Sequence, residues 1–400
     1  MQMKTVFIIT VLTSRMIMPG MPNLGGLGKD FKVPGMGSAM RSLNMDLTSD
    51  KSVDAHSKAQ CAIPEGLKLG PKVDLQIDLP VKDKPVAKDE DPGDEGKVEK
   101  GKFVMKMYWD CAETVPPGQP RVMDSDKMMN GVGTMKDWKM PQMTKNTARV
   151  AVLDADNSRA YWPGNNAKSI KEDSSTPGLF ELTTNYCGGT SITFDKAQDF
   201  LAPIDLISPG KGAVDLAKTI KVEWKSVPNA EAYMITAFSG KDNEMVMWTS
   251  SSQPDMGSDF MYSALSKEEV KKYIDNGVLM PPTKTSCRIP AGIFKTTGAP
   301  MISVLAIGAD KAQEKDGIRT VITVRSSAAV MLGGGMDGED EESIDQSDEP
   351  KKDAVDDDAT EDTSDEDSGD AIDKVNDASD LGERAKDAVG RLGGLFKKRK

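Results

Sequence analysis

Apolar and polar residues alternate in several stretches of this 400-residue chain, which is the pattern of β-strands with one buried face. The clearest stretch is 218–238, KTIKVEWKSVPNAEAYMITAF, where every second residue from Ile220 to Trp224 is apolar. A turn at Pro228 separates this run from a second one that begins at Tyr233. Because a buried tryptophan removes a large apolar area from water, we expect these two strands to form the centre of a sandwich.

The same alternation predicts further strands, separated by segments rich in glycine, proline, asparagine and serine. With the two above, the expected ranges are 73–79, 102–109, 148–153, 179–186, 191–194, 219–224, 231–238, 244–250, 300–307 and 317–325. Between them, 112–147 and 155–178 are predicted to be long loops. The predicted fold class is therefore mainly β.

One helix is predicted within the strand-rich part of the chain. Ser266 and Glu269 have the spacing of a capping box, in which each side chain binds a free backbone N–H at the helix start. Asn276 and Gly277 provide a left-handed stop at the other end. We expect this helix to cover one edge of a sheet.

The first 20 residues, MQMKTVFIITVLTSRMIMPG, have the pattern of a secretory signal. Lys4 gives a short positive region, and 5–13 form an apolar run too short to span a bilayer. The alternative is a buried strand. With the signal, the protein is expected to be periplasmic or secreted; without it, cytoplasmic. Residues 21–60, rich in glycine, proline and methionine, are predicted to be flexible.

The remaining chain divides by composition into four parts. We expect a β-rich region at 61–200, a sandwich at 201–332, a disordered acidic linker at 333–370, and an amphipathic helix with a basic end at 371–400. The apolar face of that helix is formed by Leu381, Ala385, Ala388, Val389, Leu392, Leu395 and Phe396. The helix suits contact with an anionic membrane surface, a groove of a partner, or the acidic tail itself. The alternative is a frayed terminus that serves only solubility.

The net charge of −12 is concentrated in that tail. Residues 337–370 hold 18 acidic residues against Lys351 and Lys352, so the rest of the chain carries about +4. The charge by itself neither favours nor opposes a nucleic-acid partner, and none is expected.

Four cysteines and one histidine limit the possible chemistry. The cysteines are widely spaced and form no C-x-x-C motif: Cys61, Cys111, Cys187 and Cys287. They could form two disulfides of undetermined pairing or remain free thiols. His56 lies in a polar stretch, where an exposed loop residue is expected. A single histidine argues against histidine-dependent triads and metal sites, and no nucleotide-binding or nucleophile motif occurs. We therefore expect no enzyme and no cofactor.

A resemblance supports the sandwich. The segment IKVEWKSVPNAEAYMITAF is similar to the B and C strands of fibronectin type III domains, through Trp224, Pro228, Ala230 and Tyr233. The segments MISVLAIGAD and GIRTVITVR resemble the last hairpin of that fold. The chain differs from the family at 251–299, where it has an insertion that contains the predicted helix. A further segment, YWDCAETVPPGQPRVMD, resembles uncharacterised exported proteobacterial proteins, which implies no activity.

These observations favour a non-enzymatic exported protein that contacts another protein or an envelope surface through its sandwich. Metal handling is the alternative, because thioethers are soft ligands suited to Cu(I) and the chain has 25 methionines. The candidate ligands are clustered in one predicted loop: Met123, Met128, Met129, Met135, Met140 and Met143. Methionine also fills gaps in irregular loops, which would account for the same cluster without a metal.

Overall fold

The computed structural model describes residues 5–17, 39–79, 103–125, 158–164, 168–210, 214–254, 260–261 and 263–332. They belong to a compact unit that spans Met1–Asp337, whereas Gly338–Lys400 form a second unit. The described residues are mainly β-strands, which confirms the predicted fold class. The expected acidic linker, terminal helix and strand at 148–153 lie outside them.

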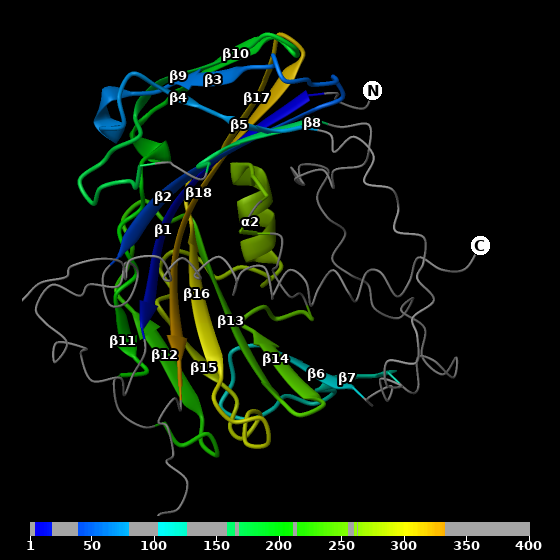
Figure 1. Ribbon diagram of the computed structural model, residues 1–400. Coiled ribbons are helices and arrows are strands. Elements are labelled where there is room, and N and C mark those ends of the chain that lie inside the picture. Colours follow the sequence, from blue (N-terminus) through cyan, green and yellow to red (C-terminus); the bar gives the residue numbers. More distant parts are fainter. Residues whose placement is uncertain are drawn as a thin grey trace, which may run out of the picture. The chain divides into compact units, whose positions relative to one another are not determined.

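Eleven strands form one large sheet in the order β5-β8-β2-β1-β18-β16-β13-β14-β6-β7, with β17 also paired to β18 (Figure 1). Their bounds are β1 Thr5–Ile17, β2 Met40–Ser49, β5 Gln76–Asp78, β6 Val104–Trp109, β7 Arg121–Asp124, β8 Ser158–Trp162, β13 Ala232–Lys241, β14 Glu244–Thr249, β16 Met301–Ile307, β17 Lys311–Lys315 and β18 Ile318–Met331. Strands from before and after residue 200 therefore share one sheet.

Two smaller sheets pack with the large one. The first has the order β10-β9-β3-β4, and the second β11-β12-β15. Their bounds are β3 Ala59–Ala62, β4 Lys72–Asp74, β9 Gly178–Thr184, β10 Gly189–Phe194, β11 Leu206–Ser208, β12 Ile220–Trp224 and β15 Ser286–Ile289. One continuous core joins the three sheets, with Phe7, Val304 and Val324 from the large sheet, Phe180 from the first small sheet and Trp224 from the second. We call the core-facing side of the large sheet its inner face.

The segment assigned to a secretory signal is strand β1, in the middle of the large sheet. It pairs along its length with β18 in parallel and with β2 in antiparallel. Phe7, Ile9 and Val11 are at most 1% exposed. The structure has this segment as a buried strand, which was the alternative interpretation. A signal and a buried strand are both short apolar runs, so the local pattern does not separate them.

Several other segments also differ from expectation. Residues 40–60, expected to be flexible, contain β2 and the first two residues of β3, and the expected loops at 112–147 and 155–178 contain β7 and β8. In β2, Leu43, Met45 and Leu47 are buried while the residues between them are polar, so a period-2 signal was present. The short strands β7, β8, β11 and β15 are held mainly by their neighbours, and a local pattern indicates them poorly.

The helix α2, Lys267–Asp275, confirms its predicted ends. At the start, the side chain of Ser266 accepts a hydrogen bond from the backbone N–H of Glu269, and the side chain of Glu269 accepts one from the backbone N–H of Ser266. At the end, Gly277 has a left-handed φ of 72°. The helix packs on the outer face of the large sheet, opposite β11, β12 and β15 (Figure 1), where Val270 joins a second core with Met234. None of the described helices has the length and apolar character needed to cross a membrane.

Candidate functional site: a methionine-rich sheet face

Methionines line the outer face of the large sheet, from the part that α2 covers to β7. We call this surface the methionine face, and its members are Met105 and Met107 of β6, Met123 of β7, Met234 of β13, Met245 and Met247 of β14, Met301 of β16 and Met331 of β18. Directly opposite residues of neighbouring strands point to the same side of a sheet. The pairings therefore join these side chains into rows.

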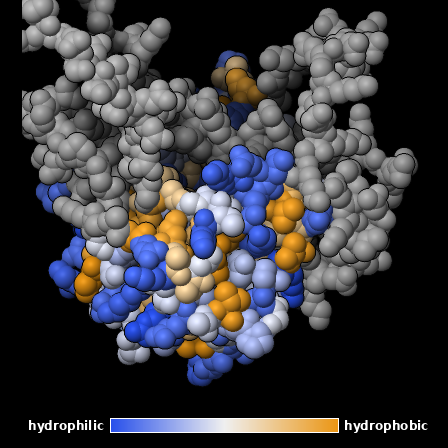
Figure 2. Space-filling view, turned by 90° about the horizontal axis from the view of Figure 1, so that it is seen from below, coloured by the Kyte–Doolittle hydropathy of each residue, from blue (hydrophilic) through white to orange (hydrophobic). Residues whose placement is uncertain are grey.

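One row crosses five strands. Met331 pairs with Met301, Met301 with Phe238, Phe238 with Met247, and Met247 with Met107. The exposed fraction is 38% for Phe238 and 37% for Met301, whereas Met107 is buried. Figure 2, which views the molecule from below, shows apolar residues reaching the surface in separate patches between hydrophilic ones. An apolar row thus runs from the surface into a buried position.

A groove of about 300 Å³ lies along this row. It is lined by Met107, Tyr108, Met234, Thr236, Ala237, Phe238, Met247, Trp248, Thr249, Met261, Ser303 and Leu305. That volume is at the lower end of ligand pockets, which are typically apolar with a few polar groups. The hydroxyls of Thr236, Thr249 and Ser303 are such groups. The groove is suited to apolar side chains.

The groove offers little for acid–base catalysis. Tyr108 is its one titratable residue, and burial raises the pKa of the phenol above its usual value. General acid–base catalysis is most efficient with a pKa near the working pH. Because this shift moves the phenol away from neutral pH, the described lining favours binding over proton transfer.

The methionine loop predicted from the sequence is only partly described. Met123 lies on β7 directly opposite Met105, and is half-buried. Met128, Met129, Met135, Met140 and Met143 lie outside the described residues. The sequence analysis missed the other methionines of the face. The signal was present, because M-x-M occurs in both VMKMYW and EMVMWT, two stretches that were predicted to be strands.

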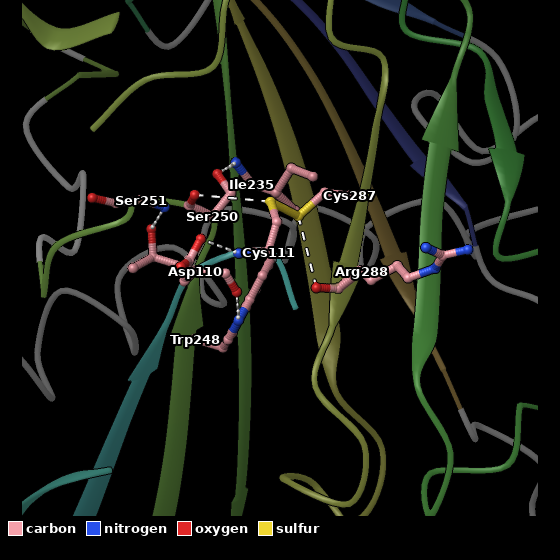
Figure 3. Close-up of a disulfide and its surroundings, with 9 residues drawn as sticks. Asp110, Cys111, Ile235, Trp248, Ser250, Ser251, Cys287 and Arg288 are labelled. Carbon is pink, nitrogen blue, oxygen red and sulfur yellow. Dashed lines mark hydrogen bonds between the residues drawn. A yellow bond between two sulfur atoms is a disulfide. The ribbon is translucent and has the colours of Figure 1, made fainter. Parts of the chain in front are cut away.

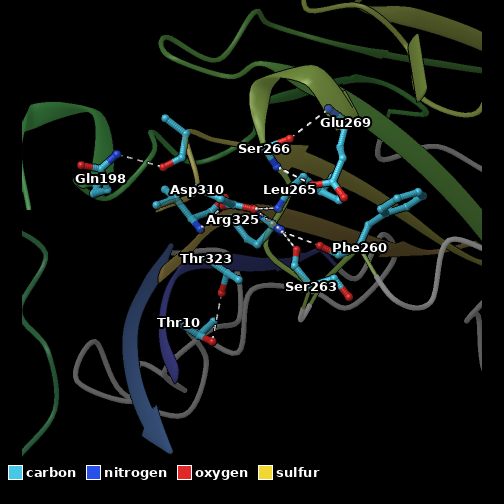
Figure 4. A network of polar contacts seen from close by, with 12 residues as sticks. Thr10, Gln198, Phe260, Ser263, Leu265, Ser266, Glu269, Asp310, Thr323 and Arg325 are labelled. Carbon is cyan, nitrogen blue, oxygen red and sulfur yellow. Dashed lines mark hydrogen bonds and ion pairs between the residues drawn. The ribbon is translucent and has the colours of Figure 1, made fainter. Parts of the chain in front are cut away.

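The buried ion pair of Arg325 and Asp310 is a second cluster of polar side chains (Figure 4). The two guanidinium NH₂ groups donate to the two carboxylate oxygens at 2.6 and 2.8 Å. The guanidinium also donates to the backbone carbonyls of Phe260, Ser263 and Val324. Asp310 in turn accepts from the backbone N–H groups of Leu265 and Val324. These bonds use all five donors of the arginine, so the pair holds the loop before α2 and leaves no donor for a ligand.

A disulfide joins Cys111 and Cys287, so the end of β6 is tied to β15 of the small sheet (Figure 3). Beside it, the indole N–H of Trp248 donates to the carbonyl of Asp110 at 3.0 Å. Cys61 and Cys187 are free, so the four cysteines form one disulfide, where the sequence had left two disulfides or free thiols open. Burial raises the pKa of Cys61 to about 12 and also raises that of Cys187, which makes both poor nucleophiles.

Other functional classes find little support among the described residues. His56 is exposed, as expected. Across the described ranges, no group of three or more histidine, cysteine or acidic side chains could hold a metal ion.

Comparisons with protein-family models, curated proteins and solved structures found no match. The methionine face is therefore the candidate site.

Proposed function

We propose that the protein is a non-enzymatic binding protein that takes apolar side chains of a partner protein into the groove of the methionine face. The groove itself carries this proposal, because Met107, Met234, Met247 and Met261 line it together. Methionine is unbranched and polarizable, so its side chain adapts to differently shaped apolar partners. Phe238 adds an exposed aromatic ring at the same place.

We also propose that 201–332 form a fibronectin type III-like sandwich. Support comes from the strands that resemble B and C, β12 and β13, which lie in different sheets as they do in sandwiches of this kind. The strands β16 and β18 are antiparallel neighbours, and β16 also pairs with β13. Within GIRTVITVR, however, residues 318–322 pair with β17, and β16 pairs with the part of β18 from Arg325 onwards. In this chain β1 and β2 extend one sheet of that sandwich.

We propose a periplasmic or secreted location, with the cytoplasm as the alternative. The disulfide between Cys111 and Cys287 supports export, because such bonds persist in oxidising compartments. Cleavage after residue 17 would remove β1 from the sheet, so the proposal rests on the disulfide and not on a removable leader. Contact of the C-terminal helix with a membrane surface stays a prediction.

A peptide-display selection on the whole protein tests the binding proposal. We expect enrichment of peptides with closely spaced leucine, phenylalanine or methionine, and loss of their binding to Met247→Lys, which puts a charge in the groove. Met331→Lys is the matched control, because Met331 is 40% exposed in the same row but does not line the groove. Equal binding to both variants would show that the peptides bind elsewhere and would reject the proposal.

A further inference from the structure

We propose that Met105, Met123 and Met245 form a site for a soft monovalent cation, Cu(I). The three residues lie on adjacent strands in one register. Met105 of β6 pairs with Met123 of β7 on one side and with Met245 of β14 on the other. The strands β14, β6 and β7 run next to one another at the lower right of Figure 1.

This register brings three thioethers together on one side of the sheet. Neighbouring strands are about 4.8 Å apart, and directly opposite side chains point the same way. Met105 stands in the middle of the row, so the other two side chains flank it. Because a methionine side chain has three rotatable bonds, the three sulfurs can turn towards one ion.

The environment of the row leaves room for an ion. All three side chains are half-buried, so they are neither locked in the core nor fully in water. Gly240 is the residue opposite Met245 on β13, and it adds no side chain at that end of the row. A Cβ placed on Gly240 would be in ordinary van der Waals contact with the carbonyl oxygen of Glu244 and the ring of Phe238, at 3.7 and 3.8 Å, so these groups border that end of the row.

The ligand set selects the ion. Thioethers are soft, uncharged donors that suit Cu(I), whereas Mg²⁺ and Ca²⁺ need oxygen ligands. The ion pair of Lys106 and Glu244 involves the alternate positions of β6 and β14, which face the other side of the sheet. The paired residues of this row therefore offer no acidic side chain to a hard cation.

The site is distinct from the groove of the binding proposal. Met105, Met123 and Met245 do not line the groove, and the groove methionines Met107 and Met247 belong to the next row. A failure of one proposal therefore leaves the other standing. The site also differs from the loop cluster predicted from the sequence, with which it shares only Met123.

The test is methyl NMR of the whole protein labelled at its methionine methyl groups, titrated anaerobically with Ag(I) as a redox-inert substitute for Cu(I). We expect one equivalent to shift the methyl signals of Met105, Met123 and Met245, each assigned from its Met→Leu variant. This readout separates the site from Cys61 and Cys187, the free thiols, which also bind soft metals.

Affinity gives the second measurement. In competition with a chromophoric Cu(I) chelator, Met105→Leu should weaken binding at least about tenfold, whereas Met301→Leu on the same face should not change it. Leucine is close to methionine in volume, so both variants should fold. Shifts confined to other methionines, no shift at all, or equal losses in the two variants would overturn the site.

Discussion

The ring of Tyr233 meets the indole of Trp224 edge-on, with 5.2 Å between the ring centroids and 68° between their planes. The phenol oxygen also accepts a hydrogen bond from the backbone N–H of Val227 at 2.8 Å. Both rings are at most 1% exposed. The contact joins β12 of the small sheet to β13 of the large one, and the same hydroxyl fixes the turn between them.

Tyr233→Phe tests that role of the hydroxyl. The variant keeps the ring contact but leaves the buried N–H of Val227 without a partner, so the free energy of unfolding should fall by about 1–3 kcal/mol. Urea denaturation followed by tryptophan fluorescence would measure the change. A variant within about 0.5 kcal/mol of the parent would mean that water replaces the hydroxyl.

The disulfide should contribute strongly to stability. Cys111 and Cys287 are separated by 176 positions, and a cross-link that closes a long loop restricts the unfolded chain most. The double variant Cys111→Ala/Cys287→Ala should therefore lose about 2–5 kcal/mol. Guanidinium denaturation of the variant and of the parent, with and without reductant, gives the comparison. An unfolding midpoint of the parent that does not move on reduction would contradict the expected role.

Breaking the buried ion pair should cost more than breaking an exposed one. Arg325→Met leaves the carboxylate of Asp310 buried and uncompensated, and we expect a loss of about 3–5 kcal/mol. The control is Arg288→Met, because Arg288 pairs with Glu113 where both side chains are more than half exposed. That variant should change stability by less than about 1 kcal/mol. Similar losses in thermal unfolding would refute the assignment of a structural role to Arg325.

The pair of Lys106 and Glu244 predicts a pH dependence. The hydrogen bond from Lys106 holds the pKa of Glu244 below its usual 4.5. A depressed carboxyl pKa adds stability above the unfolded-state value, and that stability is lost as the pH falls through the folded-state value.

Lys106→Gln should therefore lower stability near neutral pH by about 0.5 kcal/mol, since the two side chains are 31% and 28% exposed. The difference from the parent should begin to shrink below the unfolded-state pKa of Glu244 and approach zero as the pH falls through its lower folded-state pKa. Denaturation of both proteins across this range measures it. A difference that stays constant with pH would mean that the lysine acts through packing and not through charge.

The sequence correctly predicted the elements whose start, end or buried face is specified by neighbouring residues. The helix α2 has both caps in its sequence, and β12 alternates cleanly up to Trp224. Partners across the sheet could not be predicted, because alternation tells which residues share a side of a strand but not which strand lies next to it. The stretches of β6 and β14 were both expected to be strands. Their parallel pairing, which brings Met105 beside Met245, depends on contacts far apart in the sequence.

The pairing of β1 with β18 has a consequence for how the chain folds. Thr5 has its partner at Ile318, so one edge of an apolar strand made near the start of synthesis stays unpaired until the last strand of the sheet has been made. Contacts of such long range slow folding, and an unpaired apolar strand is prone to aggregate while it waits. The other edge of Thr5–Ile17 can pair early with β2, so the edge that β18 covers is the part of this strand most open to wrong pairing before the chain is complete.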